Sequence, residues 1–319
     1  MDFFCSTTNC PIGNGGGTCK TIEDVEKFVR TGIWAVEIGS ITELARPGNE
    51  GNIFFAGSGY TLNSLGLPNP GRKYYEAHLP AMIAMIHKAG KIAIVNVVGF
   101  SKEEYAELTS LAFICGADLV VLNAGCPNVW VDGQQKGILT YDYTFDSLRK
   151  VVTYTLSKNL SEAADGRIGL KLSPIFDPFH IKNMADFLDG YVLRSSPGKR
   201  IPYVGFIATQ NTIPNCYNEN NEGDAVISPA KGLSGMAGNA ILPMALGQVR
   251  QFRELLDPKI KIIGVGGITS GKDMEKMINC GADCVQVVSA YYRTEDVSVF
   301  NHIGGEYLGL REMKVNRIE

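Results

Sequence analysis

The sequence predicts an α/β protein built as a closed (β/α)8 TIM barrel, in which eight parallel strands alternate with helices. Short apolar runs rich in β-branched residues alternate with helical stretches along most of the 319 residues. Several runs are hydrophobic at nearly every position, which is typical of parallel strands buried on both faces. Eight such runs over about 300 residues indicate a barrel.

Eight segments are predicted as strands, the first of them on a weak pattern. In chain order they are 10–16, 33–39, 91–99, 118–125, 167–173, 203–209, 261–267 and 284–290. The alternative is an open doubly wound sheet. A dinucleotide-binding version of that sheet would carry GxGxxG after an early strand, but the late GVGGIT has threonine where the third glycine belongs. The barrel is therefore favoured.

Helix signals lie between these segments. Thr21 is an expected N-cap, and Asp24 places a carboxylate near the start of the helix predicted over 21–32. The stretch SKEEYAELTSLAFICG (101–116) carries a Ser-x-x-Glu capping box, and a third helix is expected over 271–282. Two long connections, 40–73 and 210–238, are expected to build an active-site lid. No linker interrupts the pattern, so one domain is predicted over 1–319.

Composition excludes several classes of function. Hydrophobic residues make up 45% and charged residues 20% of the chain, as in a globular protein. The net charge is -3 and no block of basic residues occurs, which argues against binding to nucleic acid or an anionic membrane. The apolar runs are shorter than the ~20 residues of a membrane helix. The N-terminus lacks the pattern of a signal peptide, so a cytosolic location is expected.

Cysteine and histidine spacing gives no metal site. The eight cysteines form no CxxC pair, and the four histidines have no ligand spacing, so neither disulfides nor a bound metal is predicted. Cys126 differs from the others because it lies in NAGCPN, directly after the apolar run DLVVL. It is either a packed structural thiol or a reactive base.

In a barrel, the chemistry gathers at the carboxyl ends of the strands. Polar residues and glycines occupy these positions: Lys20, Ser40, Asn96, Asn123, Cys126, Lys171, Asn211, Gly266–Gly267 and Ser289. Lys171 ends an apolar strand and needs an anionic partner if buried. Lys20 is either a site residue or a solvated helix start.

Two further patterns suggest ligands. GVGGITSG, between a strand and a helix, and Ser289 after the last strand fall in the two loops that usually bind phosphate, although a tight turn is the simpler reading. Asparagines 63, 69, 123, 128 and 211 could hold a flat imide, since each amide offers donors and an acceptor. Singly, each could also be a turn residue.

Several motifs together resemble the dihydroorotate dehydrogenase family. They are NAGCPN, SLGLPNPG followed by KYY, LARPGNEG, LKLSPIFD, QNTIPN, GLSG, IIGVGGI with SGKD, and GADCVQV. The resemblance runs from about residue 12 to about residue 295. It implies an FMN-dependent barrel that oxidises dihydroorotate to orotate in pyrimidine biosynthesis.

The resemblance also implies a role for each matching residue. Cys126 would be the base, as in the soluble class, and Lys20 would pair with the substrate carboxylate. Dihydroorotate would further contact Asn63, Leu65, Gly66, Leu67, Asn123, Asn128, Asn211 and Thr212. FMN would lie on Gly16, Gly17, Ser40, Asn96, Asn123, Lys171, Gln210 and Gly235. The phosphate of FMN would lie on Gly266, Gly267, Val288 and Ser289.

The chain departs from the soluble class in two places. GSIT has Gly39 where that class carries a lysine, whereas Lys20 has the placement of the membrane-associated class. The stretch after Cys126, VWVDGQQKGILTYD, is longer than usual. Fumarate is the first expectation for the electron acceptor, with NAD through a partner subunit as an alternative. A homodimer is expected.

Two other functions remain open at this point. One is an FMN reductase of another cyclic amide, such as a dihydropyrimidine. The other is a flavin-binding barrel without redox turnover.

Overall fold

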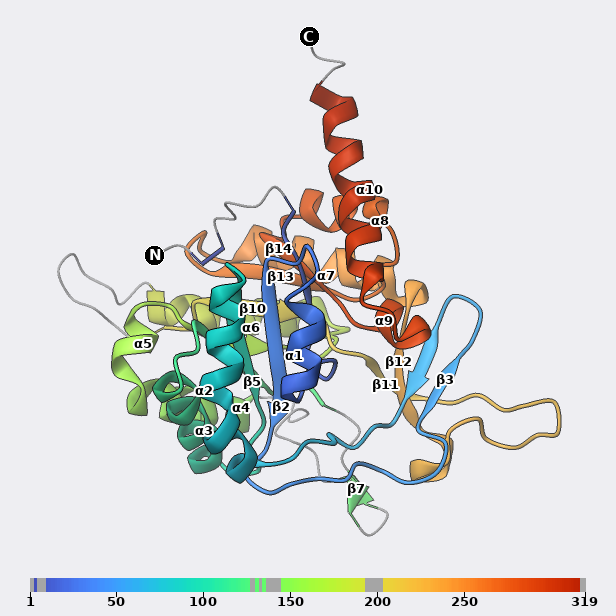
Figure 1. Cartoon of the computed structure of the whole chain (residues 1–319), viewed down its shortest axis with the longest axis horizontal. Coiled ribbons are helices and arrows are strands. Elements are labelled where there is room, and N and C mark those ends of the chain that lie inside the picture. Colours follow the sequence, from blue (N-terminus) through green and yellow to red (C-terminus); the bar gives the residue numbers. More distant parts are fainter. Residues whose placement is uncertain are drawn as a thin grey trace.

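The computed structural model describes residues 3–4, 10–126, 130–131, 134–135, 145–192 and 203–315. Its centre is a closed parallel barrel in the order β1-β14-β13-β10-β9-β6-β5-β2 (Figure 1). The ring closes through the pairing of Gly13 with Ala35. The barrel strands are β1 (Ile12–Asn14), β2 (Ala35–Ile41), β5 (Ile92–Val97), β6 (Leu119–Asn123), β9 (Ile168–Lys171), β10 (Phe206–Thr209), β13 (Lys261–Val265) and β14 (Cys284–Val287). All eight predicted strands are confirmed, each within the expected segment or beginning inside it.

Helices surround this ring and cover its outer face (Figure 1). They are α1 (Ile22–Phe28), α2 (Arg72–Lys88), α3 (Lys102–Ile114), α4 (Asp146–Lys158), α5 (Leu160–Ala164), α6 (Pro178–Val192), α7 (Leu242–Leu255), α8 (Gly271–Asn279), α9 (Ser289–Thr294) and α10 (Ser298–Val315). Two 3-10 turns, η1 (Pro229–Gly232) and η2 (Asn239–Ile241), complete them. No helix among the described residues combines the length and apolar character needed to cross a bilayer.

The predicted helix start is confirmed in full at α1 and in part at α3. Thr21 Oγ1 accepts from the Asp24 N–H, and the Asp24 carboxylate accepts from the Thr21 N–H, so the capping box is complete. At α3, Ser101 Oγ accepts from the Glu104 N–H, but the Glu104 carboxylate accepts from Phe100 N–H rather than from Ser101. The reciprocal bond is thus shifted by one residue.

The two long connections contain strands that were not predicted. They form a small antiparallel sheet in the order β11 (Ile213–Cys216), β12 (Ser234–Ala237), β4 (Thr61–Asn63) and β3 (Phe54–Ala56). We call it the cover sheet. Its strands have three or four residues, and β4 pairs with β12 from a distant part of the chain, so no local pattern revealed them. A further pair, β7 (Trp130–Val131) with β8 (Gln134–Gln135), lies in the segment after Cys126.

The inside of the barrel is apolar at the amino ends of the strands. A separate core cluster takes inward residues from six strands, including Ile94, Val121, Phe206 and Ile263. Phe4 packs on Phe206 at 5.3 Å between ring centroids and closes this end. The polar residues therefore gather at the opposite, carboxyl end.

Candidate functional site

A pocket opens at the carboxyl ends of the barrel strands, beside the cover sheet. Residues that lie far apart in the sequence meet here. The predicted site residues that line it are Gly16, Gly17, Lys20, Ser40, Asn63, Leu65, Gly66, Leu67, Asn123, Cys126, Lys171, Gln210, Asn211, Thr212, Gly266, Gly267, Val288 and Ser289. All residues selected by the positional rule for barrels except Asn96 line this cavity, and the other residues in the list were implied by the family resemblance.

Four predicted residues have other positions. Asn69 is buried outside the pocket wall, and its Nδ2 donates to Thr42 Oγ1 at 2.9 Å. Asn128 lies outside the described residues. Gly235 is not in the pocket wall but pairs with Asn63 in the cover sheet, where its carbonyl accepts from Asn63 Nδ2 at 3.1 Å. Asn96 is fully buried behind the wall, and its Nδ2 donates to Glu37 Oε1 at 2.7 Å.

Several pocket residues were not predicted. They are Phe54, Thr61, Pro68, Ala237, Ile241, Val265, Ile268, Gln286, Val287 and Tyr292. Gln286 had a detectable signal, since it is a polar residue inside the otherwise apolar strand CVQV. Glu37 in β2 had the same signal. Phe54, Thr61 and Ala237 had none, because the cover sheet that presents them depends on long-range pairing.

The loop after β13 forms a cradle for an anion. Gly266 and Gly267 have φ values of +117° and +82°, and a Cβ on Gly267 would lie 2.7 Å from Leu242 Cα. Among the described residues, no acceptor pairs with the backbone N–H groups of Gly267, Ile268 and Ser289, all of which line the pocket. Three such donors at neighbouring strand ends fit a phosphate group.

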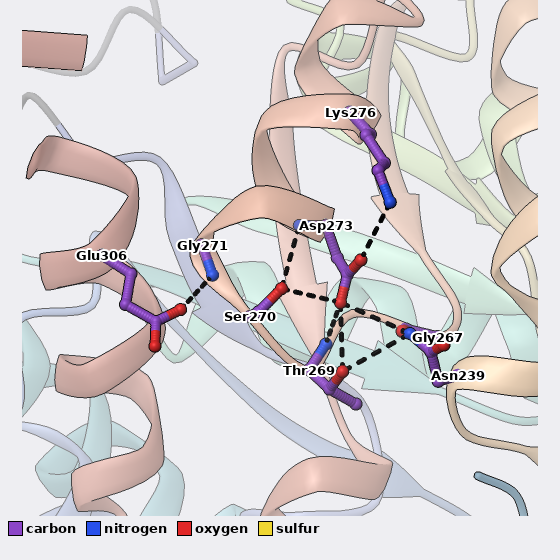
Figure 2. Close-up of polar contacts among 8 residues, drawn as sticks. All are labelled: Asn239, Gly267, Thr269, Ser270, Gly271, Asp273, Lys276 and Glu306. Atoms are coloured by element: carbon purple, nitrogen blue, oxygen red, sulfur yellow. Dashed lines mark hydrogen bonds and ion pairs between the residues drawn. The ribbon is translucent and has the colours of Figure 1, made fainter. Parts of the chain in front are cut away.

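Two backbone donors in the first turn of α8 are already used within the chain (Figure 2). Glu306 accepts from Gly271 N–H at 2.7 Å, and Ser270 Oγ accepts from Asp273 N–H at 3.2 Å. These two N–H groups of α8 are therefore occupied, whereas the three N–H groups of the cradle have no acceptor among the described residues. The loop itself supplies the donors.

Asp273 holds this loop in place (Figure 2). Its Oδ2 accepts from Thr269 N and Oγ1, from Ser270 Oγ and from Asn239 Nδ2, at 2.9 to 3.4 Å. Asn239 Nδ2 also donates to Gly267 O at 3.1 Å. The loop after β13 is thus tied to the segment that follows the cover sheet.

The departure at Gly39 has a steric reason. Its φ is +120°, and a Cβ there would lie 2.4 Å from Asn96 O, so no side chain fits. Gly39 N–H donates to Cys19 O at 2.8 Å, which places Lys20 beside this point on the pocket wall. Burial lowers the pKa of Lys20, while the charges of Asp24 and Cys19 act in the opposite direction. Its backbone is held by Asp24 Oδ2 and by the hydroxyl of Tyr75.

Lys171 is a second cation in the pocket. Its side chain is buried, with 5% of its surface exposed, and it has no hydrogen-bond or ion-pair partner among the described residues. A buried ammonium without a partner is costly, so this position is suited to an electron-rich group of a ligand. Next to it in register, Asn123 Nδ2 donates to Ser40 Oγ at 3.0 Å.

Cys126 lies three residues beyond the end of β6, and 9% of its surface is exposed. Asn211 Nδ2 donates to Gly125 O at 2.6 Å, and Asn211 Oδ1 accepts from Thr212 N–H. The loop that carries the thiol is therefore fixed to the segment after β10. Cys126, Asn211 and Thr212 line the same cavity as Lys20 and Lys171.

Comparison with known proteins agrees with this geometry. A family model described as dihydroorotate dehydrogenase matches residues 2–308. The chain belongs to the dihydroorotate dehydrogenase family. It is 32% identical over 302 residues to a probable dihydroorotate dehydrogenase A (fumarate) of Streptococcus pneumoniae, covering 93% of this chain and 88% of the relative. It is 29% identical over 322 residues to a dihydroorotate dehydrogenase (fumarate) of Saccharomyces bayanus, covering 98% and 93%.

A solved structure shares the fold. The dihydroorotate dehydrogenase of Eimeria tenella, in complex with ferulenol, superposes with a TM-score of 0.75 at 20% identity. The match covers 95% of this chain and 82% of that chain. The TIM barrel predicted from the sequence is thus confirmed.

The Asp273 network leads to a stability prediction. Asp273→Ala leaves the hydroxyl of Thr269, the hydroxyl of Ser270 and the amide of Asn239 without their shared acceptor, so the free energy of unfolding should fall by roughly 1–3 kcal/mol. Urea denaturation measures this. Lys276→Met is the control, since it removes only a half-exposed ion pair at 3.5 Å and should cost less than about 0.5 kcal/mol. Equal stability of the two variants would contradict the role given to Asp273.

Proposed function

We propose that this chain is an FMN-dependent dihydroorotate dehydrogenase of the de novo pyrimidine pathway, formed by one domain over 1–319. The observation that carries the proposal is the convergence of chemically different polar groups on one cavity. The anion cradle, the unpartnered Lys171, the thiol of Cys126 and the ammonium of Lys20 all line it. Each requires a different part of a flavin or of a charged cyclic imide.

The residues present fit FMN. The cradle of Gly267, Ile268 and Ser289 would hold its phosphate, and Gly16 and Gly17 allow close approach of a flat ring. Gln210 has neither amide atom satisfied among the described residues, although 1% of its surface is exposed, so a ligand with a donor and an acceptor suits it. Lys171 would face the N1/O2 edge of the flavin, where negative charge grows on reduction.

Bound FMN supplies the acceptor for the hydride that leaves C6 of dihydroorotate. The chain's own residues do the rest. Asn63, Asn123 and Asn211 would hold the imide, and Lys20 would pair with the carboxylate of the substrate. Cys126 Sγ, as a thiolate, would take the proton from C5.

Fumarate is the proposed electron acceptor, since the relatives that match over most of the chain carry it in their names. Reduction of fumarate to succinate consumes the two electrons that oxidation of dihydroorotate delivers. The homodimer and the cytosolic location remain predictions.

The first test concerns the cofactor. The purified protein should carry one non-covalent FMN per chain and should bleach when dihydroorotate is added without oxygen. Acid release followed by chromatography identifies the chromophore. FAD, or no flavin after expression with added riboflavin, would refute the proposed cofactor; FMN that dihydroorotate cannot reduce would favour a different cyclic amide or a non-catalytic barrel.

The second test concerns Lys20. Lys20→Ala should lower kcat/KM for dihydroorotate about 30- to 1000-fold, the effect of losing roughly 2–4 kcal/mol of charge-assisted contact, while FMN stays bound. Because burial lowers the pKa of Lys20, kcat/KM of the natural enzyme should fall on the alkaline side below the ordinary lysine value of 10.5. This decline should be absent from the variant. If the variant keeps a near-natural kcat/KM, Lys20 does not contact the substrate and is only a residue that precedes α1.

The third test concerns the base. Cys126→Ser should slow anaerobic reduction of FMN by dihydroorotate by at least ~10²-fold, because a hydroxyl is far less acidic than a thiol. The flavin absorbance should stay normal, and the rate in the natural enzyme should rise with pH along one ionisation. Stopped-flow spectroscopy measures both. If the Cys126→Ser variant and the natural enzyme reduce FMN at rates within a few-fold of each other, Cys126 is not the base and is only a packed loop thiol.

A further inference from the structure

One carboxylate inside the barrel has no part in the chemistry above. Glu37 in β2 has 0% exposed surface. Its Oε1 accepts from Asn96 Nδ2 at 2.7 Å, and its Oε2 accepts from Gln286 Nε2 at 2.5 Å. No lysine, arginine or histidine of the described ranges forms an ion pair with it. Glu37 is thus a buried acid held by two neutral amides.

This carboxylate lies directly under the pocket wall. A Cβ built on Gly16 would lie 2.6 Å from Glu37 Oε1 and 2.8 Å from Asn96 Nδ2. Gly16 and Gln286 both line the pocket. Only the backbone of a glycine therefore separates the carboxylate from a ligand on that wall.

The fold itself does not need an acid at this position. β2 pairs with β5 through its backbone, and burial of a carboxylate without a cation disfavours the folded state. An apolar side chain would suit the inside of the barrel better, as Ile94 and Val121 do in the layer below. A costly group next to a binding site suggests a use there.

We propose that Glu37 lowers the reduction potential of the bound flavin and so counteracts Lys171. This inference rests on the proposed function. Reduction adds negative charge to the flavin, which a nearby ammonium favours and a nearby carboxylate disfavours in a poorly solvated site. Glu37 therefore assists the transfer of two electrons to fumarate at the expense of their uptake from dihydroorotate.

The test is Glu37→Gln, which removes the charge and keeps the shape. Asn96 Oδ1 and Gln286 Oε1 have no donor among the described residues, so either amide can turn and accept from the new Nε2. If Glu37→Gln does not fold, Glu37→Met is the second variant, because it also removes the charge. Glu37→Asp keeps the charge. Asp189→Asn is the matched control, because it removes a carboxylate outside the pocket wall that accepts only from Asp257 N–H among the contacts described.

The measurement is an anaerobic redox titration of each flavin-loaded protein against a reference dye, with flavin content and thermal unfolding recorded. At a fixed ambient potential, Glu37→Gln should raise the ratio of reduced to oxidised flavin at least ~10-fold, which is about 30 mV for a two-electron couple. Glu37→Asp and Asp189→Asn should stay within about threefold of the natural protein.

Two results would overturn the inference while the proposed function stands. One is a flavin-loaded Glu37→Gln protein whose potential matches the natural one. The other is an equal shift of the flavin potential in Asp189→Asn, which would show that the potential responds to the total charge of the protein and not to Glu37 in particular. A natural protein without flavin would overturn the proposed function and this inference together.

Discussion

Closure of eight parallel strands into a ring brings all their carboxyl ends to one rim, and the rest of the site depends on this constraint. The amino half of the barrel interior is filled by apolar side chains and closed by Phe4. The carboxyl half is lined by amides, a carboxylate and a lysine that could not be buried without partners. Partners within the chain satisfy Asn123 and Glu37. Lys171 and Gln210 line the pocket without such partners among the described residues, and the proposed ligand would satisfy them.

Hydrogen bonds connect the cover sheet with the loops that follow the last two barrel strands. Asn239 donates to Gly267 O and to the Asp273 carboxylate, while Arg293, which follows the last barrel strand, donates to Gly57 O at the turn between β3 and β4. These bonds join the anion cradle to the sheet that carries Asn63. Two sides of the pocket are thus joined by one set of hydrogen bonds.

The backbone at Gly39 determines where Lys20 lies. The backbone there passes so close to Asn96 O that a side chain is impossible, and the same approach pairs Gly39 with Cys19. Lys20 follows directly and reaches the pocket wall. Lys20 thus lines the pocket because the backbone of Gly39 brings Cys19 and its neighbour to the rim of the barrel.

The sequence by itself determined the barrel, the starts of α1 and α3 and most residues at the strand ends, because hydrophobic periodicity, capping and strand termini are local properties. It identified Lys171 and Cys126 as polar groups after apolar strands. It did not reveal the cover sheet, since strands of three or four residues acquire stability only from pairing across the chain. It also placed Asn96 in the pocket, whereas the tertiary structure turns its amide toward Glu37. Which neighbour a buried polar group contacts is decided by three-dimensional packing, and so the electrostatic pairing inside the barrel could be known only from the folded structure.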